Sequence, residues 1–300
     1  MSPAIEAATL RLATRGSALA RAQAALAAAA IERAGGPTAG KLAGDLVIVR
    51  TGGDRHQATP IDEMGGQGWF TAEIERALLE GTADIAVHAA KDLPTELAPG
   101  LEVAGVLERA DPRDALVSAS GGGVDALPDG AIVGSSSARR AALLHDLRPD
   151  LRCVPMRGNV DTRLGKLDEG QVDALLLAAA GLDRLGLSDR IGERLDPRAF
   201  VPAPAQGAIA LEVLTGSAAS AYAAAAGDAT TDLEVRTERA LLRALGGGCL
   251  LPFGAWARLE DGVLVLSAAL AVDGVVRRAE LGGDPGHTAE LVARVASLLQ

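Results

Sequence analysis

Short buried-strand signals alternate with helix signals along the first two thirds of this 300-residue chain. This alternation is the strongest constraint on its fold, because it is typical of α/β domains with open, largely parallel sheets. The first part of the pattern predicts strands at Leu10–Ala13, Asp45–Arg50 and Asp84–His88 and helices at 17–34 and Phe70–Glu80.

The alternation continues beyond Pro112, where the chain is expected to enter a second unit. Pro202 and Pro204 then indicate an extended crossing that leads into a strand at Ala208–Val213. Between these prolines the pattern predicts strands at Ala131–Gly134, Leu151–Pro155 and Ala174–Leu177. It predicts helices at Val160–Glu169 and Ala179–Leu185, and a helix that begins after Ser137 and carries Arg139 and Arg140 in its first turn.

The last quarter of the chain has a different pattern. The turn signals Asp261-Gly262 and Asp273-Gly274 separate three apolar runs, as in an antiparallel meander. The pattern predicts a helix at Thr230–Leu245, strands at Phe253–Arg258, Val263–Leu270 and Val275–Leu281, and a terminal helix at His287–Leu299.

The chain carries a formal net charge of −10. This argues against a nucleic-acid groove as the main site, because phosphate binding needs a basic surface. We see neither a signal peptide nor an apolar run of bilayer length, so we expect a cytoplasmic protein with no membrane partner. Its four histidines are scattered and none has ligand spacing to either of the two cysteines, which predicts no metal site.

Asp92 and Lys91 follow the strand Asp84–His88 at its carboxyl end, where open α/β sheets bind ligands. A carboxylate at that place can exchange protons or stabilise a developing cation. The alternative is a loop aspartate that caps a turn before Pro94.

Five arginines stand at or near predicted helix starts, where a cation does not favour the helix. Guanidinium groups at helix N-termini suit an anion, and carboxylate and phosphate fit equally well. The alternative is that each arginine pairs with a surface acid. These residues are Arg15, Arg139, Arg140, Arg157 and Arg163.

Cys249 follows three glycines at the end of a predicted helix. The glycines leave space for a bulky adduct, and the helix C-terminus does not favour a thiolate. The cysteine therefore suits a stable attachment point better than a fast nucleophile, although a lone buried cysteine is the plainer interpretation. Cys153, inside an apolar strand, is interpreted as a buried cysteine.

Taken together, these motifs resemble the porphobilinogen deaminase family over nearly the whole chain. Their joint order and spacing are specific, although any one of them is modest evidence. The matching segments are Leu10–Ser17, Gly65–Phe70, Asp84–Pro94, Glu108–Asp114, Val133–Arg140, Arg157–Leu167, Leu176–Leu187, Pro204–Ile209 and Glu238–Pro252.

The resemblance implies an α/β protein of three domains. Two hinged lobes, similar to type II periplasmic-binding-protein lobes, span residues 1–107 with 204–226 and residues 108–203. A small α+β C-terminal domain, residues 227–300, bears the cofactor. The implied activity is that of a monomeric transferase, hydroxymethylbilane synthase, which condenses four porphobilinogen molecules head to tail with loss of ammonia in tetrapyrrole and haem biosynthesis.

The resemblance also implies a covalent dipyrromethane cofactor, thioether-linked to Cys249. Asp92 is implied as the catalytic carboxylate, which binds pyrrole N–H groups of the cofactor and stabilises cationic intermediates. Further cofactor contacts are implied for Lys91, Ser136, Arg139 and Arg140. Substrate contacts are implied for Arg15, Ser17, Arg157, Arg163, Arg184 and Gln206.

The chain departs from the family pattern at a few positions. Glu63 and Gln67 stand where some members have basic residues, so the loop 51–68 is expected to cover the cleft without binding substrate carboxylates. Ala89 and Ala90 replace a serine and a bulkier residue. Two other interpretations are a solute-binding or ligand-sensing module without catalysis and an inactive family member, but the triple glycine before Cys249 favours the enzyme.

Overall fold

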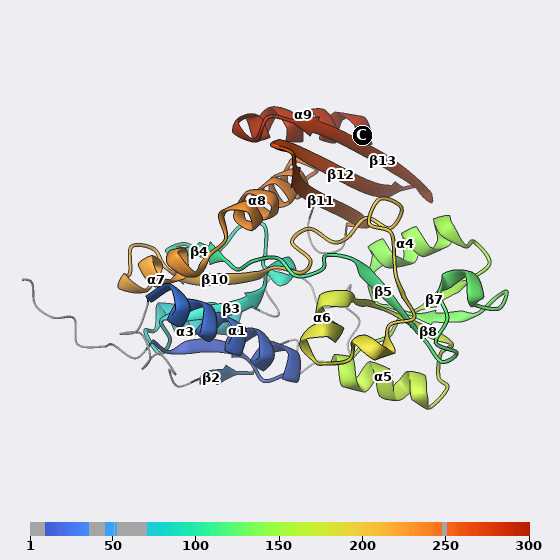
Figure 1. Cartoon of the computed structure of the whole chain (residues 1–300), viewed down its shortest axis with the longest axis horizontal. Helices are drawn as coiled ribbons and strands as arrows, with labels where there is room; N and C mark the ends of the chain where they lie inside the picture. The colour runs from blue at the N-terminus through green and yellow to red at the C-terminus, as the bar shows by residue number, and fades with distance from the viewer. Residues whose placement is uncertain (1–9, 36–45, 51, 53–70, 248–250) are drawn as a thin grey trace, which may run out of the picture. The chain divides into compact units, whose positions relative to one another are not determined.

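The computed structural model describes residues 10–35, 46–50, 52, 71–247 and 251–300 (Figure 1). Its contacts divide the chain into two compact units. Unit 1 comprises Met1–His56, Gly68–Arg109 and Ala208–Asp232, and unit 2 comprises Gln57–Gln67, Ala110–Gly207 and Leu233–Gln300.

Unit 1 is built on a five-stranded sheet in the order β2-β1-β3-β10-β4. The strands β1 (Leu12–Arg15), β2 (Leu46–Val49) and β3 (Ile85–Ala89) run parallel. The strand β10 (Ile209–Leu214) runs antiparallel to both of its neighbours, β3 and β4 (Leu101–Val106). The crossing segment predicted before residue 208 therefore returns the chain into the first sheet.

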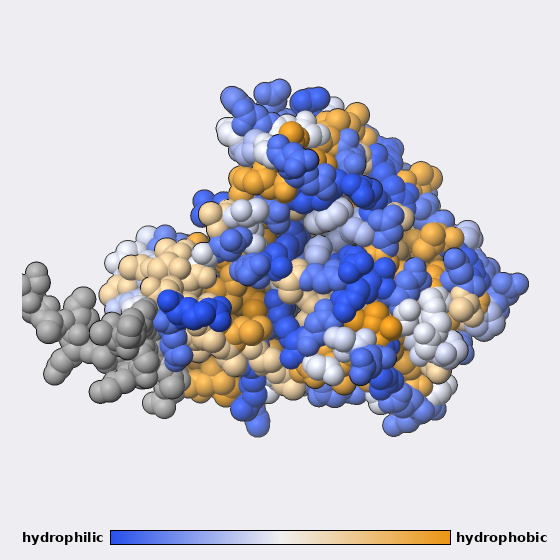
Figure 2. All heavy atoms as spheres, viewed as in Figure 1, coloured by the Kyte–Doolittle hydropathy of each residue, from blue (hydrophilic) through white to orange (hydrophobic). Residues whose placement is uncertain are grey.

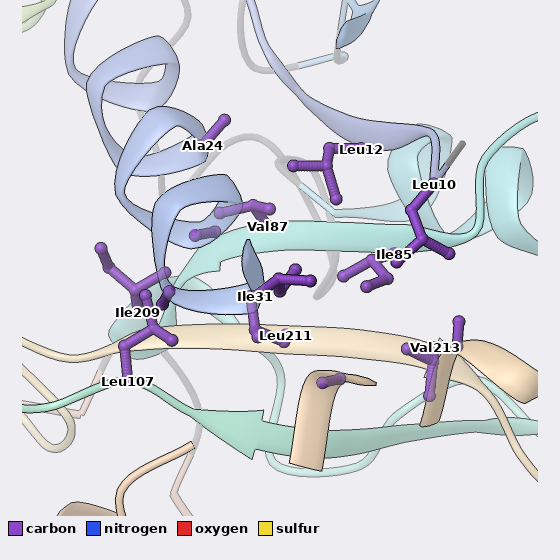
Figure 3. Close-up of a cluster of buried hydrophobic side chains, with 14 residues drawn as sticks. Leu10, Leu12, Ala24, Ile31, Ile85, Val87, Leu107, Ile209, Leu211 and Val213 are labelled. Carbon is purple, nitrogen blue, oxygen red and sulfur yellow. The ribbon is translucent and has the colours of Figure 1, made fainter. Parts of the chain in front are cut away.

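Helices cover both faces of the unit 1 sheet. On one face, α1 (Ala18–Gly35) and α7 (Ala218–Ala226) pack on an aliphatic cluster that contains Ile31, Val87 and Leu211 (Figure 3). On the other face, α3 (Ala72–Leu79) packs on β1, β3 and β10. Successive strand residues alternate between these two faces, which fixes which side chains each helix meets.

Unit 2 contains a second five-stranded sheet, in the order β7-β6-β8-β5-β9. Strands β6, β7 and β8 are parallel, whereas β5 runs antiparallel to β8 and β9. The strands are β5 (Asp114–Ser118), β6 (Ile132–Gly134), β7 (Arg152–Val154), β8 (Ala174–Ala178) and β9 (Glu193–Arg194). The helices are α4 (Ala138–Leu147), α5 (Val160–Asp168) and α6 (Ala179–Arg184), with 3₁₀ turns η4 (Val124–Ala126) and η5 (Ser188–Arg190).

The last part of unit 2 is the predicted meander. Its sheet has the order β11-β12-β13, and both of its hairpins are antiparallel. The two central residues of each turn have positive φ, 50° and 80° at residues 261 and 262 and 50° and 79° at residues 273 and 274, as a type I′ turn requires. The elements are α8 (Ala229–Ala244), β11 (Phe253–Glu260), β12 (Val263–Val272), β13 (Val275–Gly283), the 3₁₀ turn η6 (Pro285–His287) and α9 (Thr288–Leu299).

The predicted fold class is confirmed: two sheet-and-helix lobes of α/β type are followed by a small α+β part with three strands. Each of the two five-stranded sheets is largely parallel, as expected, with four strands pointing the same way. The fifth strand, β10 in one sheet and β5 in the other, pairs antiparallel with both neighbours. The strands β4, β5 and β9 and the helix α7 were not predicted. Hydrophilic and apolar side chains intermix on the visible face (Figure 2), as is usual for a globular protein.

Candidate active site

Asp92 lies at the carboxyl end of β3, as predicted. The strand runs directly into the 3₁₀ turn η3 (Ala90–Asp92), which leaves Asp92 exposed and Lys91 half-buried. The N–H of Ala90 donates to the carbonyl of Ala208 at 3.1 Å and ties this turn to the start of β10. The carboxylate is thereby held at the edge where α/β sheets bind ligands.

Arg15 ends β1 at the same edge of the sheet. The two strands pair in parallel with Ala13 opposite Ala86, so continuing this register places Arg15 level with His88. The hydroxyl of Ser17 accepts a hydrogen bond from the N–H of Ala20 at 3.2 Å and caps α1. Ser17 is thus an N-terminal cap of α1, and its contact with substrate stays a prediction.

In unit 2, Arg139 and Arg140 converge on one buried carboxylate, that of Asp114. Nη1 of Arg139 donates to Asp114 Oδ2 at 2.6 Å, and Nε of Arg140 donates to Oδ1 at 2.8 Å. The Asp114 side chain is fully buried. Burial alone would raise its pKa, but the charges of Arg139 and Arg140 outweigh burial and hold the pKa of Asp114 far below its usual range.

Backbone carbonyls complete the cradle of these two arginines. Arg139 donates to the carbonyl of Val201 at 2.8 Å, and Arg140 donates to that of Leu176 at 2.9 Å. Nε of Arg139 is buried without a hydrogen-bond partner, and Nη2 of Arg140 lies 2.7 Å from Asp114 Oδ1. The pair is therefore fixed in orientation.

Gln206 and Ser136 are bound to the protein itself. The amide of Gln206 donates to the carbonyl of Pro112 at 2.8 Å and to Asp114 Oδ1 at 3.1 Å. The hydroxyl of Ser136 donates to the carbonyl of Met156 at 2.9 Å and accepts from its N–H at 3.0 Å. Both side chains hold the cluster together, and ligand contacts by either stay predictions.

Arg163 is a cation without a matching acid. Its Nε donates to the carbonyl of Gly158 at 2.8 Å, and no carboxylate within the described ranges forms an ion pair with it. Burial, together with the charges of Arg140 and Arg157, lowers the pKa of Arg163 to about 10. Three guanidinium groups therefore repel one another here, and an anion would relieve that repulsion.

Arg184, at the end of α6, also lacks an ion pair in the part of the chain that the structure describes. Its Nη2 donates to the carbonyl of Gly207 at 2.6 Å, and burial lowers its pKa. Guanidinium groups of this kind suit a ligand with several carboxylate or phosphate groups.

Asp114 is a site residue that the sequence analysis did not select, although it ends one of the motif segments. The sequence feature that could have identified Asp114 is an acidic residue at the start of a largely apolar strand. A carboxylate buried there requires cationic partners. Cys153 is half-buried rather than buried, and burial raises the pKa of its thiol. Cys249, Glu63 and Gln67 lie outside the described residues.

Within the described ranges, no group of three histidine, cysteine or carboxylate side chains could hold a metal ion. None of the helices there has the length and apolar character that a membrane span needs.

Family models match most of the chain. The model described as "Porphobilinogen deaminase, dipyromethane cofactor binding domain" matches residues 10–221, and that for the C-terminal domain of porphobilinogen deaminase matches residues 232–300. The chain is 43% identical over 304 residues to the porphobilinogen deaminase of Acidothermus cellulolyticus, covering 99% of this chain and 90% of the relative. The porphobilinogen deaminase of Syntrophobacter fumaroxidans is 44% identical over 285 residues, 94% of this chain and 91% of that protein.

The solved structures that align with this chain are more distant in sequence. The periplasmic VFT2 domain of Bordetella pertussis BvgS aligns over 73% of this chain and 86% of its own, with 18% identity and a TM-score of 0.41. The aliphatic sulphonate binding protein SsuA of Escherichia coli aligns over 79% and 70%, with 16% identity and a TM-score of 0.39. The family matches, which span both units, are decisive instead: the chain belongs to the porphobilinogen deaminase family.

Proposed function

We propose that Asp92 is the catalytic carboxylate of this enzyme and that Cys249 carries its cofactor. As a porphobilinogen deaminase, the protein is a transferase of tetrapyrrole biosynthesis. It joins four porphobilinogen molecules head to tail, with loss of ammonia, to form hydroxymethylbilane on a dipyrromethane primer. The proposal concerns which side chains of this chain perform that reaction.

The arginines of unit 2 fit a polycarboxylate, and this observation carries the assignment. Arg140 is buried and Arg157 and Arg163 are half-buried, and burial, together with the charges of Arg140 and Arg157, lowers the pKa of Arg163 to about 10. Each pyrrole bears an acetate and a propionate, which guanidinium groups bind in a two-pronged manner. When bound, the dipyrromethane supplies the free pyrrole carbon to which the next unit is joined.

Asp92 is suited to the chemistry because it is an exposed carboxylate on a turn that hydrogen bonds to β10. Positive charge develops on a pyrrole nitrogen as ammonia leaves, and a nearby carboxylate stabilises that charge. The same carboxylate can accept the proton whose removal restores the aromatic ring.

The other residues are assigned to binding. We assign cofactor contacts to Arg139, Arg140, Lys91 and Ser136, and substrate contacts to Arg15, Ser17, Arg157, Arg163, Arg184 and Gln206. We further propose a monomer that works in the cytoplasm, with three domains bounded at residues 107, 203 and 226. The family resemblance supports these three points.

Intact mass spectrometry of the purified protein tests the cofactor assignment. We expect a mass increment of two pyrrole units on the wild type and none on Cys249→Ser. An unmodified wild-type chain that binds porphobilinogen without consuming it would favour a binding module instead.

Replacement of Asp92 by Asn tests the catalytic assignment. The turnover number should fall by about 10²–10⁴-fold, while the free energy of unfolding stays close to that of the wild type because the side chain is exposed. A loaded, folded D92N protein with near wild-type turnover would refute the role of Asp92.

A further inference from the structure

A second buried ionic cluster lies in unit 1, and the assignments above do not use it. Nε2 of His88 lies 3.0 Å from Oε2 of Glu212, and their side chains are 3% and 0% exposed. Glu75, from the first turn of α3, is also buried. Three titratable side chains from three elements therefore meet inside the apolar part of unit 1.

The cluster contains more acid than base. Its two carboxylates face one imidazole, so full ionisation would leave a net negative charge inside the protein. Oε1 of Glu75 and Oε1 of Glu212 are buried without a hydrogen-bond partner. Burial raises the pKa of Glu75 and a hydrogen bond with Thr71 lowers it, while the charge of Glu212 raises it and the charge of His88 lowers it.

The charged groups around the cluster follow from strand alternation. On the sheet face that α3 covers, β3 presents His88, β10 presents Glu212, and the end of β1 presents Arg15. On α3 itself, Glu73, Arg76 and Glu80 accompany Glu75. The Arg11–Asp84 ion pair lies at the opposite ends of the strands. Of these groups, Glu212 and His88 are the ones whose charges act on Glu75.

The position of the cluster links it to the reaction. His88 is four residues before Asp92 on the strand that carries the catalytic turn, and Thr71 is the N-cap of α3. Glu212 lies on β10, whose preceding residue Ala208 accepts the hydrogen bond from Ala90. The three side chains thus tie together the elements that set the place of Asp92.

We propose that Glu75, Glu212 and His88 form a positioning cluster for Asp92, in which Glu75 is a neutral carboxylic acid and Glu212 and His88 share a hydrogen bond. Glu75 then holds one proton that an exposed glutamate would release at neutral pH. Coupled buried carboxylates commonly share protons in this way. The positioning role rests on the proposed function of Asp92, whereas the protonation of Glu75 does not depend on it.

Infrared difference spectroscopy tests the protonation part without reference to activity. At neutral pH the wild type should show the C=O band of a protonated carboxylic acid, and the band should be absent from Glu75→Gln. The control Glu80→Gln changes an exposed residue of the same helix region and should retain the band. A wild type without the band would overturn the proposal, whatever the role of Asp92.

The pH dependence of turnover by the cofactor-loaded enzyme tests the positioning part. E75Q should keep its turnover number toward alkaline pH, where Glu75 of the wild type ionises. Glu212→Gln should lower the turnover number by about tenfold with little change in KM, because it replaces the carboxylate that hydrogen bonds to His88 by a neutral amide. Cofactor-loaded variants with the pH profile and turnover number of the wild type would overturn the positioning part. If E212Q does not acquire the cofactor, the pH profile of E75Q alone decides this part.

Discussion

The two buried ionic clusters of this protein have opposite imbalances. In unit 2, one carboxylate, Asp114, faces Arg139 and Arg140, and Arg163 adds a further cation close by. In unit 1, two carboxylates face the single imidazole of His88. Both clusters are shielded from water. In such surroundings an uncompensated charge costs much free energy.

The excess negative charge and the excess positive charge are neutralised in different ways. A surplus of acid can be neutralised by a proton, which solvent supplies at any time, as we propose for Glu75. A surplus of guanidinium cannot release its proton near neutral pH, so it requires an anionic ligand. A surplus of acid is therefore typical of a cluster that supports the site, and a surplus of guanidinium is typical of a cluster that binds a ligand.

The largest effect is expected at Asp114. Asp114→Asn would leave two buried guanidinium groups without a counter-ion and should lower the free energy of unfolding by about 3–5 kcal/mol. Urea denaturation measures this change, with the exposed Asp189→Asn as the matched control. An unchanged midpoint would mean that the two arginines do not depend on Asp114.

A smaller effect of opposite sign is expected at Arg163. In protein without cofactor, Arg163→Met should raise the free energy of unfolding by about 1 kcal/mol, because it removes a half-buried cation that forms no ion pair with a described carboxylate. The same variant should show reduced elongation with porphobilinogen. Arg152→Met, at an exposed position of β7, is the control for both measurements. If R163M were less stable than the wild type, the charge of Arg163 would already be balanced by an acidic group of the protein.

The smallest effect is expected at Glu75 and depends on pH. The pKa of Glu75 is raised in the folded state, so its stabilising contribution is complete below the unfolded-state pKa and is lost as pH rises through the folded-state pKa. Glutamine is neutral throughout. The Tm of E75Q relative to the wild type should therefore increase toward alkaline pH, by roughly 2–4 °C for each kcal/mol. A Tm difference that is the same at pH 5 and pH 9 would contradict a raised pKa.

Local signals predicted the parts of the site that depend on neighbouring residues. Ser137 caps α4 and places Arg139 and Arg140 in its first turn, as expected from the sequence. Asp92 follows a strand whose apolar run was evident. The partner of the arginines was not predictable in the same way, because Asp114 lies 25 residues from Arg139 along the chain and meets it only through packing.

The elements that were missed also have a physical explanation. The strand β4 contains Gly105, where a Cβ atom would lie 2.0 Å from the carbonyl oxygen of Ala223 in α7. The close approach of the helix thus requires glycine, which weakens the strand signal. The helix α7 is almost entirely alanine, so it has no polar face that would reveal a helical period.

The carboxylate of Asp114 and the carbonyls of Val201 and Leu176 immobilise two long side chains when the protein folds. A flexible arginine gives up as much as about 2 kcal/mol of rotamer entropy when it grips a ligand. At Arg139 and Arg140 that ordering has already occurred, so more of each contact with an acid side arm contributes to affinity. A lysine in either place would keep the charge and lose this advantage, because one ammonium group cannot span the same partners.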